Sequence, residues 1–316
     1  MDKKKIEKDY FEKINLIENY NKNYYDLSSP LVADNIYDEL KREILDLEKR
    51  YFFLKSEKSP SKNVGFKPSK NFKKFTHRTP MLSLSNAFTE EDLINFEKKI
   101  INFLSIKENF KLSYSAEPKI DGISASLNYL NGKFIKGLSR GDGKEGEDIT
   151  KNLETIKDIP KRILSKDFPD EIEIRGEVFI QNSDFETIKE KFANPRNAAS
   201  GSLRQKKPED TEKIPLKFIA YAFGYEKGLK IENQFSYLKK LDEWGFKTNP
   251  LNKLVTGIKN LLKNYDEIEK KRQNLDFDID GIVYKVNDFI LQKRLGNVAN
   301  APRWAVAHKF SSNKAI

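Results

Sequence analysis

Six short clusters along the chain combine charged side chains with glycines or prolines, a composition suited to binding or transferring a charged group. The first, residues 117–122, places Lys119 two residues before Asp121 and beside a glycine turn. A lysine amine is a nucleophile only without its proton, and burial or neighbouring cations favour that form. Lys119 is therefore a candidate nucleophile. The Lys-x-Asp-Gly pattern alone is weak, because it also arises by chance in a surface turn.

Three further clusters place arginines or a carboxylate beside small residues. Arg140 lies in a glycine-rich stretch, where a ligand can approach the backbone and a guanidinium can fork onto phosphate or ribose oxygens. Glu177 lies in a strand pattern and could accept hydrogen bonds from a sugar. Arg196 and Arg204 flank a run of small residues and could reach an anion. Taken singly, each has a plainer reading: a flexible loop, a cross-strand charge pair and a helix N-terminus.

The last two clusters lie near the end of the chain. Asp280 and Lys285 fall in one strand pattern, but alternation along a strand does not require them to share a face. Asp280 is a candidate for metal or general-base chemistry, and Lys285 for contact with a base edge or a phosphate. Residues 302–310 alternate as a strand lining a pocket would, and Lys309 there could lie over a phosphate.

Hydrophobic spacing predicts the elements that must position these residues. Apolar residues three or four apart predict two helices within residues 1–54, and further helices over 89–106, 183–192, 231–244 and 261–274. Alternating apolar residues predict strands over 171–180, 217–225 and 280–286, and a hairpin that turns at Asn131-Gly132. Because hairpins and long insertions join the strands, we expect an α+β fold of mainly antiparallel sheets flanked by helices.

Composition limits the class of protein. The chain has 316 residues with a net charge of +10, and its 22 Phe and 13 Tyr are too many for a disordered chain. No cysteine is present, which excludes disulfides and thiolate zinc sites within these residues. The longest apolar run, 218–223, is far too short for a membrane helix, and no signal peptide is visible. We therefore expect a cytoplasmic protein with a polyanionic partner.

The sequence also predicts domain boundaries. Residues 1–57 form a helical unit, and 79–316 form a larger α+β domain. Between them, residues 58–78 contain seven basic residues and no acidic ones. This segment is read either as a solvated linker or as a strip that contacts nucleic-acid phosphates.

In their order, the six clusters resemble the bacterial NAD-dependent DNA ligases. The nucleotidyltransferase superfamily shares the Lys-x-Asp-Gly nucleophile, while the Ser-Arg-Gly-Asp-Gly, Arg-Gly-Glu-Val-Phe, Asn-Pro-Arg-Asn and Pro-Arg-Trp signatures are similar to the NAD-dependent branch. Residues 81–86 also match it. The N-terminal helices resemble that branch's subdomain for nicotinamide mononucleotide, with Tyr24, Asp34, Tyr37 and Asp38 on its pattern and Tyr25 where the family usually has His.

The resemblance implies an adenylation domain in which Lys119 attacks NAD, releases nicotinamide mononucleotide and forms a lysine–AMP intermediate for sealing nicks. It implies catalytic roles for Lys119, Asp121 and Asp280. The implied NAD-binding residues are Tyr24, Tyr25, Asp34, Tyr37, Asp38, Ser83, Leu84, Glu117, Arg140, Glu177, Arg196, Arg204, Arg272, Lys285 and Lys309.

The resemblance also implies partners and cofactors. These are NAD, Mg²⁺ and nicked duplex DNA in replication and repair, with zinc confined to the later part of a full ligase. That later part, an OB-fold, a zinc module, helix-hairpin-helix repeats and a BRCT domain, is expected to lie beyond this chain. We expect a monomer. Two alternatives stay open: an ATP-dependent ligase or capping-type nucleotidyltransferase, and a non-catalytic basic nucleic-acid-binding protein.

Overall fold

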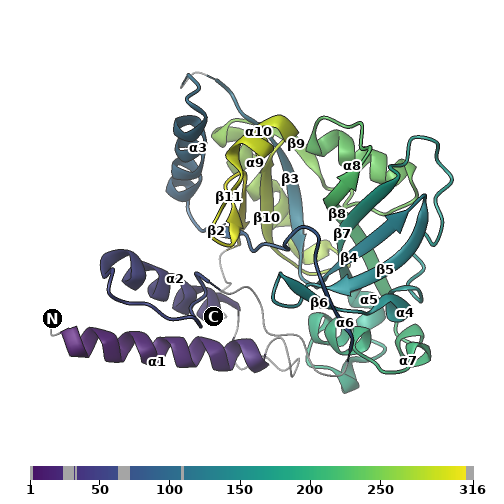
Figure 1. Ribbon diagram of the computed structural model, residues 1–316, viewed down its shortest axis with the longest axis horizontal. Helices are drawn as coiled ribbons and strands as arrows, with labels where there is room; N and C mark the ends of the chain where they lie inside the picture. Colours follow the sequence, from purple (N-terminus) through teal and green to yellow (C-terminus); the bar gives the residue numbers. More distant parts are fainter. Residues whose placement is uncertain (1–2, 24–31, 33, 63–71, 108–109, 311–316) are drawn as a thin grey trace.

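The computed structural model describes residues 3–23, 32, 34–62, 72–107 and 110–310. They form an N-terminal helical pair and two mainly antiparallel sheets surrounded by helices, which confirms the predicted α+β fold (Figure 1). None of the helices in these ranges has the length and apolarity needed to cross a bilayer.

The helical pair consists of α1 (Lys3–Asn21) and α2 (Asp34–Arg50), which lie side by side at one end of the molecule (Figure 1). The apolar spacing predicted both helices. The buried face of α1 packs against α2 and the turn after it, and this small core contains Ile6, Tyr10, Ile14, Ile17, Leu40, Ile44 and Leu54. The helices thus stabilise each other by burying a shared stripe.

The end of the basic segment 58–78 is a strand. Residues 63–71 lie outside the described part of the chain, but β1 (Lys74–Thr76) pairs antiparallel with β6 (Glu145–Glu147). This part of the segment is therefore regular structure, held by backbone hydrogen bonds to a segment about seventy residues away.

One sheet has five strands in the order β2-β13-β10-β3-β9. All neighbouring pairs are antiparallel except β13 with β2. The strands are β2 (Ser85–Ala87), β3 (Ser113–Ile120), β9 (Lys253–Thr256), β10 (Ile279–Val286) and β13 (Ala305–Lys309). A small ribbon of β11 (Asn297–Val298) and β12 (Ala301–Pro302) precedes β13.

The apolar face of this sheet is covered by helices. Tyr114, Ala116 and Ile120 alternate along β3 and join a core with residues from α3 (Glu90–Leu104), α9 (Ile258–Lys271) and α10 (Phe289–Leu295). Thr89 caps the N-terminus of α3 and forms a capping box with Asp92. Because one face of β3 is committed to this core, Ser115, Glu117 and Lys119 face the other side.

The second sheet has four strands in the order β5-β4-β7-β8, all antiparallel. They are β4 (Ile123–Leu130), β5 (Lys133–Ser139), β7 (Glu171–Ile180) and β8 (Leu216–Lys227). The predicted hairpin joins β4 to β5, and Asn131 and Gly132 have the positive φ values of 48° and 72° that the turn requires.

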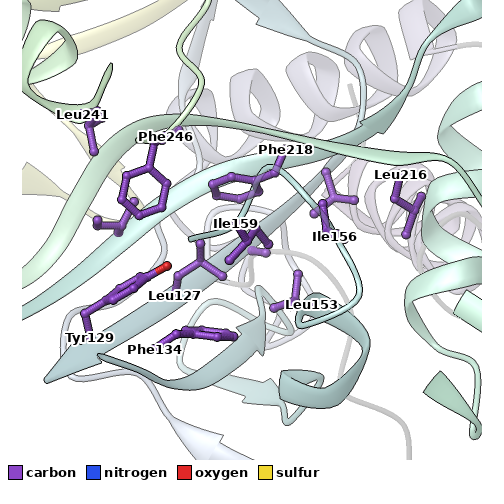
Figure 2. Packing of buried hydrophobic residues seen from close by; sticks show 14 of the residues in the cluster. Leu127, Tyr129, Phe134, Leu153, Ile156, Ile159, Leu216, Phe218, Leu241 and Phe246 are labelled. Atoms are coloured by element: carbon purple, nitrogen blue, oxygen red, sulfur yellow. The ribbon is translucent and has the colours of Figure 1, made fainter. Parts of the chain in front are cut away.

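The core of the second sheet is formed with α4 (Thr150–Leu153), α6 (Pro195–Leu203) and α8 (Gln234–Glu243). Figure 2 shows part of this core, in which Leu127 and Tyr129 of β4 lie beside Phe218 of β8 and Phe246. The short helices α5 (Asn182–Phe185) and α7 (Pro208–Glu212) complete this side. Both sheets therefore bury one face beneath helices.

Three predicted helices differ from the structure in extent. The helix predicted over 231–244 begins three residues later as α8, where Asn233 caps it. Residues 183–192 form α5 and a separate 3₁₀ turn, Lys189–Lys191, because Ile188 leaves the helical region with a φ of −126°. The helix predicted from residue 261 begins three residues earlier as α9 and ends in the 3₁₀ turn Arg272–Asn274.

Candidate active site

The polar face of the five-stranded sheet gathers charged residues from three strands. In the register, Ser115 pairs with Lys285, and Lys119 pairs with Gly281, which pairs on its other side with Lys309. Residues directly opposite in an antiparallel pair project to the same face. Glu117, Lys119, Lys285 and Lys309 therefore share one face, opposite the helix-covered core.

A β-bulge adds Asp280 to this face. The β10–β3 register shifts between Ile279 and Gly281, which leaves Asp280 as the extra residue on β10. A bulge re-aims the side chain of the extra residue. Simple alternation would place Asp280 and Lys285 on opposite faces, but the bulge directs the Asp280 carboxylate to the same lysines.

The central feature is a chain of ion pairs around Asp280. Lys119 Nζ and Lys309 Nζ both donate to Asp280 Oδ2, each at 2.8 Å. Lys309 Nζ also lies 3.3 Å from Asp38 Oδ2, so a carboxylate of α2 reaches the sheet. Although burial opposes ionisation, the two ammonium groups lower the pKa of Asp280 to about 2. Asp280 is therefore ionised at neutral pH.

A second buried pair lies further along the same face. Lys285 Nζ donates to Glu117 Oε2 at 2.6 Å, and both side chains are less than a tenth exposed. Each residue has a further partner: Ser115 and Gln234 donate to Glu117 at 2.8 and 2.9 Å, and Lys285 donates to the Tyr221 carbonyl at 2.8 Å. Such a pair offers a directed acceptor and donor to the edge of a planar ring.

The four-stranded sheet contributes Glu177 from its own polar face. Ser124 Oγ donates to Glu177 Oε2 at 2.9 Å, and Tyr221 OH lies 3.3 Å from Ser124 Oγ. Burial raises the pKa of Glu177 to about 7, and the nearby charges of Arg196 and Lys119 offset this only in part. Glu177 thus titrates near neutral pH, unlike Asp280.

Three arginines meet at a cavity between the second sheet and α6. Its lining includes Arg140, Arg196 and Arg204 with Ser124 and Ser200. Asn194 caps α6 and Pro195 begins it, so this cluster is a helix N-terminus, the simpler of the two interpretations. The same helix places Arg196 and Arg204 at its two ends. The result is a basic cavity suited to phosphate or sugar oxygens.

These arginines are held by specific partners. Arg196 forms an ion pair with Asp121, and Arg204 Nε lies 3.2 Å from Glu147 Oε2. Arg140 donates to Ser83 Oγ at 2.8 Å, which connects the cavity to the segment before β2. Leu84 follows there and is half-buried.

The predicted residues of the helical unit are only partly described. Tyr24 and Tyr25 lie outside the described residues, as does the side chain of Asp34, the first residue of α2. Tyr37 packs against the core of the helical pair and its hydroxyl donates to Asn21 Oδ1 at 2.7 Å. Asp38 contacts the larger domain through Lys309 and Asn86.

Arg272 lies at the margin of the site. Its guanidinium sits over the ring of Phe310, 5.2 Å from the centroid, one residue beyond Lys309. The structure thus brings it near the end of β13 without an ion pair to Asp280 or Asp38 among the contacts of the described residues.

Sequence reasoning missed the residues that hold the charged groups in place. Ser115, Ser124, Gln234 and the Tyr221 carbonyl each bind a predicted site residue. Ser115 could have been found from the sequence, because it lies two residues before Glu117 on β3 and so faces the same side. Ser124 is found from the strand pairing, because it lies opposite Glu177 across β4 and β7. No sequence pattern predicts the contact of Gln234 with Glu117, because it depends on how the loop after β8 brings the start of α8 to the sheet.

Within the described ranges, no cluster of three or more His, Asp or Glu residues could hold a metal ion by itself. The Asp280 Oδ1 oxygen is buried and has no hydrogen-bond partner. Asp280 therefore keeps one unused acceptor oxygen beside the two lysines.

Comparison with known proteins agrees with this geometry. Residues 69–313 match the family model described as NAD-dependent DNA ligase adenylation domain. Residues 3–65 match the one described as DNA ligase-like, N-terminal NAD⁺-binding domain. The boundary between the two matches falls inside the basic segment 58–78.

Curated relatives are similar along nearly the whole chain. A DNA ligase of Pelagibacter ubique is 66% identical over 316 residues, which is 100% of this chain and 47% of the relative. A DNA ligase of Bradyrhizobium sp. (strain ORS 278) is 45% identical over 95% of this chain and 43% of its own length. The chain therefore spans about half the length of these relatives.

Among solved structures, an archaeal ATP-dependent RNA ligase is similar over 73% of this chain and 48% of its own, with 14% identity and a TM-score of 0.41. A TM-score this low supports no conclusion about fold or activity.

Proposed function

Because this chain belongs to the family of NAD-dependent DNA ligase adenylation domains, with the associated N-terminal NAD⁺-binding domain, we propose that it transfers AMP from NAD to Lys119. The observation that carries the proposal is the position of Lys119. Its amine lies on a polar sheet face and shares the Asp280 carboxylate with Lys309, and Lys309 in turn contacts the carboxylate of Asp38 from α2. A nucleophile surrounded by cations, with a second domain over it, suits attack on a phosphate of a dinucleotide.

The bond changes are those of a nucleophilic displacement at phosphorus. Lys119 Nζ attacks the phosphorus of the adenylyl group, a nitrogen–phosphorus bond forms, and the oxygen bridge to the second phosphate breaks. Nicotinamide mononucleotide leaves with the bridging oxygen, and the amine's proton is released to solvent. A lysine–AMP phosphoramidate remains on the protein.

Asp280 acts by orienting the amine and by balancing charge. With a pKa of about 2 it is a poor proton acceptor at neutral pH, so a general-base role does not suit it. Its hydrogen bonds hold Lys119 and Lys309 on the same oxygen, which places a second cation beside the nucleophile. Lys309 would neutralise charge on the attacked phosphate.

The remaining residues would bind the adenosine half. Glu117 and Lys285 offer an acceptor and a donor to the adenine edge, while Glu177 and Arg140 bind ribose hydroxyls and Ser83 and Leu84 line the same site. Arg196, Arg204 and Arg272 supply positive charge for phosphates, and Asp121 holds Arg196. These roles are proposed from the donor and acceptor types of the side chains.

The helical unit would bind the nicotinamide half. Tyr24, Tyr25 and Tyr37 are aromatic partners for the ring, and Asp34 and Asp38 offset its positive charge. In the structure, Asp38 reaches Lys309 across the boundary between the two units. This contact supports a closed arrangement in which both halves of NAD are bound at once.

Mg²⁺ fits one place in this site. The unpaired Asp280 Oδ1 would hold it together with phosphate oxygens of NAD. When bound, the ion supplies charge neutralisation at the phosphates.

In the whole protein, we propose that AMP passes from Lys119 to a 5′-phosphate at a nick in duplex DNA, and that the 3′-hydroxyl then displaces it. The net charge of +10 and the basic residues of 58–78 support contact with DNA phosphates. We propose that the chain acts as a monomer in the cytoplasm, where bacterial DNA and NAD are found.

An adenylation assay tests this function. The chain is incubated with NAD and Mg²⁺ and its intact mass is measured. We expect a gain of one AMP, with no gain for Lys119→Ala and an unchanged gain for Lys166→Ala, an exposed lysine outside the site. AMP on the Lys119→Ala chain would disprove the nucleophile.

The same assay separates the alternatives. An equal gain with ATP in place of NAD would show an ATP-dependent nucleotidyltransferase. Salt-dependent DNA binding without any AMP gain would show a non-catalytic binding protein.

A further inference from the structure

One face of α2 is turned toward the active site. Asp38 and Arg42 are one helical turn apart, and both contact the larger domain: Asn86 Nδ2 donates to Asp38 Oδ1 at 3.1 Å, and Arg42 lies over the ring of Phe88 at 5.4 Å. Lys41 is three residues after Asp38 and next to Arg42, so it occupies the same side of the helix.

Lys41 faces cations of the active site. The side chain is half-buried, and it interacts electrostatically with Asp38, Arg140, Lys309 and Lys119. Burial and the repulsion of Arg140, Lys309 and Lys119 lower the pKa of Lys41, opposed only by Asp38. Lys41 makes no hydrogen bond or ion pair with any residue that the structure describes.

This environment is unfavourable for a lysine in the free protein. Four cations are gathered with two carboxylates, Asp38 and Asp280, and those carboxylates are already bonded to Asn86, Lys119 and Lys309. Excess positive charge of this kind is neutralised when a polyanion binds. The ligand of the proposed function has two adjacent phosphates.

The position of Lys41 distinguishes between these phosphates. Lys119 and Lys309 project from the sheet and share Asp280, so they face the phosphate that is attacked. Lys41 projects from α2, which belongs to the unit matched by the N-terminal NAD⁺-binding domain. Its ammonium therefore approaches from the unit that we propose binds the nicotinamide half of NAD, the half that carries the second phosphate.

We propose that Lys41 binds the phosphate of the departing nicotinamide mononucleotide and so favours a dinucleotide as the AMP donor. The inference rests on the proposed function and adds to it a cation on the helical unit. Charge at this phosphate increases as the bridging bond breaks, so the Lys41 contact strengthens during the reaction. AMP lacks this phosphate and should not sense Lys41.

The test compares Lys41→Met, Lys41→Arg and a control, Lys49→Met, in the full chain. Lys49 is on the same helix, and its side chain is 80% exposed. Three quantities are measured: the single-turnover rate of AMP attachment against NAD concentration, the reverse reaction of the adenylated chain with nicotinamide mononucleotide, and AMP affinity by calorimetry.

We expect Lys41→Met to lower kcat/KM for NAD by about 10- to 100-fold, the effect of one charge-assisted hydrogen bond. The concentration of nicotinamide mononucleotide needed for reversal should rise with it. Lys41→Arg should retain most of the activity, and Lys49→Met all of it. AMP affinity should not change in any variant.

Two results would overturn the inference. One is a Lys41→Met chain whose kcat/KM for NAD and whose reverse reaction with nicotinamide mononucleotide both stay within twofold of the wild type. The other is an equal loss of AMP affinity, or an arginine variant as impaired as the methionine one, because either would show a purely structural role. A wild-type chain that gains no AMP from NAD would instead refute the proposed function itself.

Discussion

At the residue scale, two carboxylates of the site have opposite pKa shifts. Asp280 binds two lysine ammonium groups, which lower its pKa to about 2 despite its burial. Burial has the largest effect on the pKa of Glu177 and raises it to about 7, because the charges of Arg196 and Lys119 offset this rise only in part. Such divergence typically separates residues of different function. Here it separates Asp280, which is charged at neutral pH, from Glu177, which we propose gains its charge when a ligand's hydroxyl donates to it.

The raised pKa of Glu177 predicts a pH-dependent stability. Because the folded-state pKa lies above the unfolded value, Glu177 favours folding below the unfolded pKa, and this contribution is lost as pH rises through about 7. Glu177→Gln stays neutral, so at pH 8.5 we expect its Tm to exceed that of the wild type by about 2–4 °C, on the order of 1 kcal/mol. The difference should shrink toward zero near pH 4.5.

Thermal unfolding between pH 4.5 and 8.5 checks this expectation. Glu186→Gln is the control, because Glu186 is exposed and, within the part of the chain that the structure describes, forms its ion pair with Lys189 three residues on. A Tm difference that does not vary with pH would contradict the assignment of Glu177 as a buried, titrating group.

At the element scale, the pairing of β10 with its two neighbours positions the reacting groups. The bulge turns Asp280 toward the lysines, and Gly281 lets β13 approach closely enough for Lys309 to share that carboxylate. A Cβ at position 281 would lie 2.3 Å from the His308 carbonyl oxygen and 2.9 Å from Lys309 Cα. The glycine is thus required by backbone packing, not by its φ angle.

Gly281→Ala is expected to destabilise the chain by about 1–3 kcal/mol, since the added methyl must push β13 away. The same displacement moves Lys309, so AMP attachment should slow by more than the loss of stability explains. Gly201→Ala in α6 is the matched control. Its Cβ would meet only Phe192 Cε1 at 3.5 Å, an ordinary contact, and the change should stabilise by about 0.5–1 kcal/mol. Urea unfolding measures the stability of each variant, and the mass assay measures its rate of AMP attachment. Equal stabilities and equal rates in the two variants would refute the packing argument.

At the scale of the whole molecule, the helical pair closes on the larger domain through a few polar contacts near the site. Asp38 meets Lys309 and Asn86, Arg42 lies over Phe88, and Asn300 Nδ2 donates to the Ser61 carbonyl at 3.1 Å. Contacts of this kind between domains allow them to separate and close again. A ligand bound to both parts would add to them and favour the closed form.

Arg42→Ala is expected to weaken closure. Loss of one cation–π contact is typically about 0.5–2 kcal/mol, so the KM for NAD should rise by roughly 2- to 30-fold, while AMP affinity stays the same. Lys239→Ala, which removes a similar contact with Phe235 on α8, should leave both unchanged. Steady-state adenylation and AMP calorimetry supply the measurements. A parallel fall in AMP affinity would show that Arg42 supports the sheet and not the closure.

The sequence by itself determined the elements and the chemistry of the site. Apolar spacing predicted α1, α2 and the start of α3, Asn131-Gly132 predicted the hairpin, and the ordered clusters indicated the family. These features are local, since they depend on residues a few positions apart or on short motifs. The predicted domain boundaries and the individual roles of the site residues remain predictions.

Only the tertiary structure decided how distant residues combine. Alternation alone would separate Asp280 from Lys285, yet the bulge brings Asp280 to a lysine 161 residues away. Neither the pKa of Glu177 nor the approach of Lys41 to the lysines can be inferred locally, because burial and charge depend on every element packed around a group. Register, bulges and domain closure are set by partners far along the chain, and these partners turned a list of charged residues into a site.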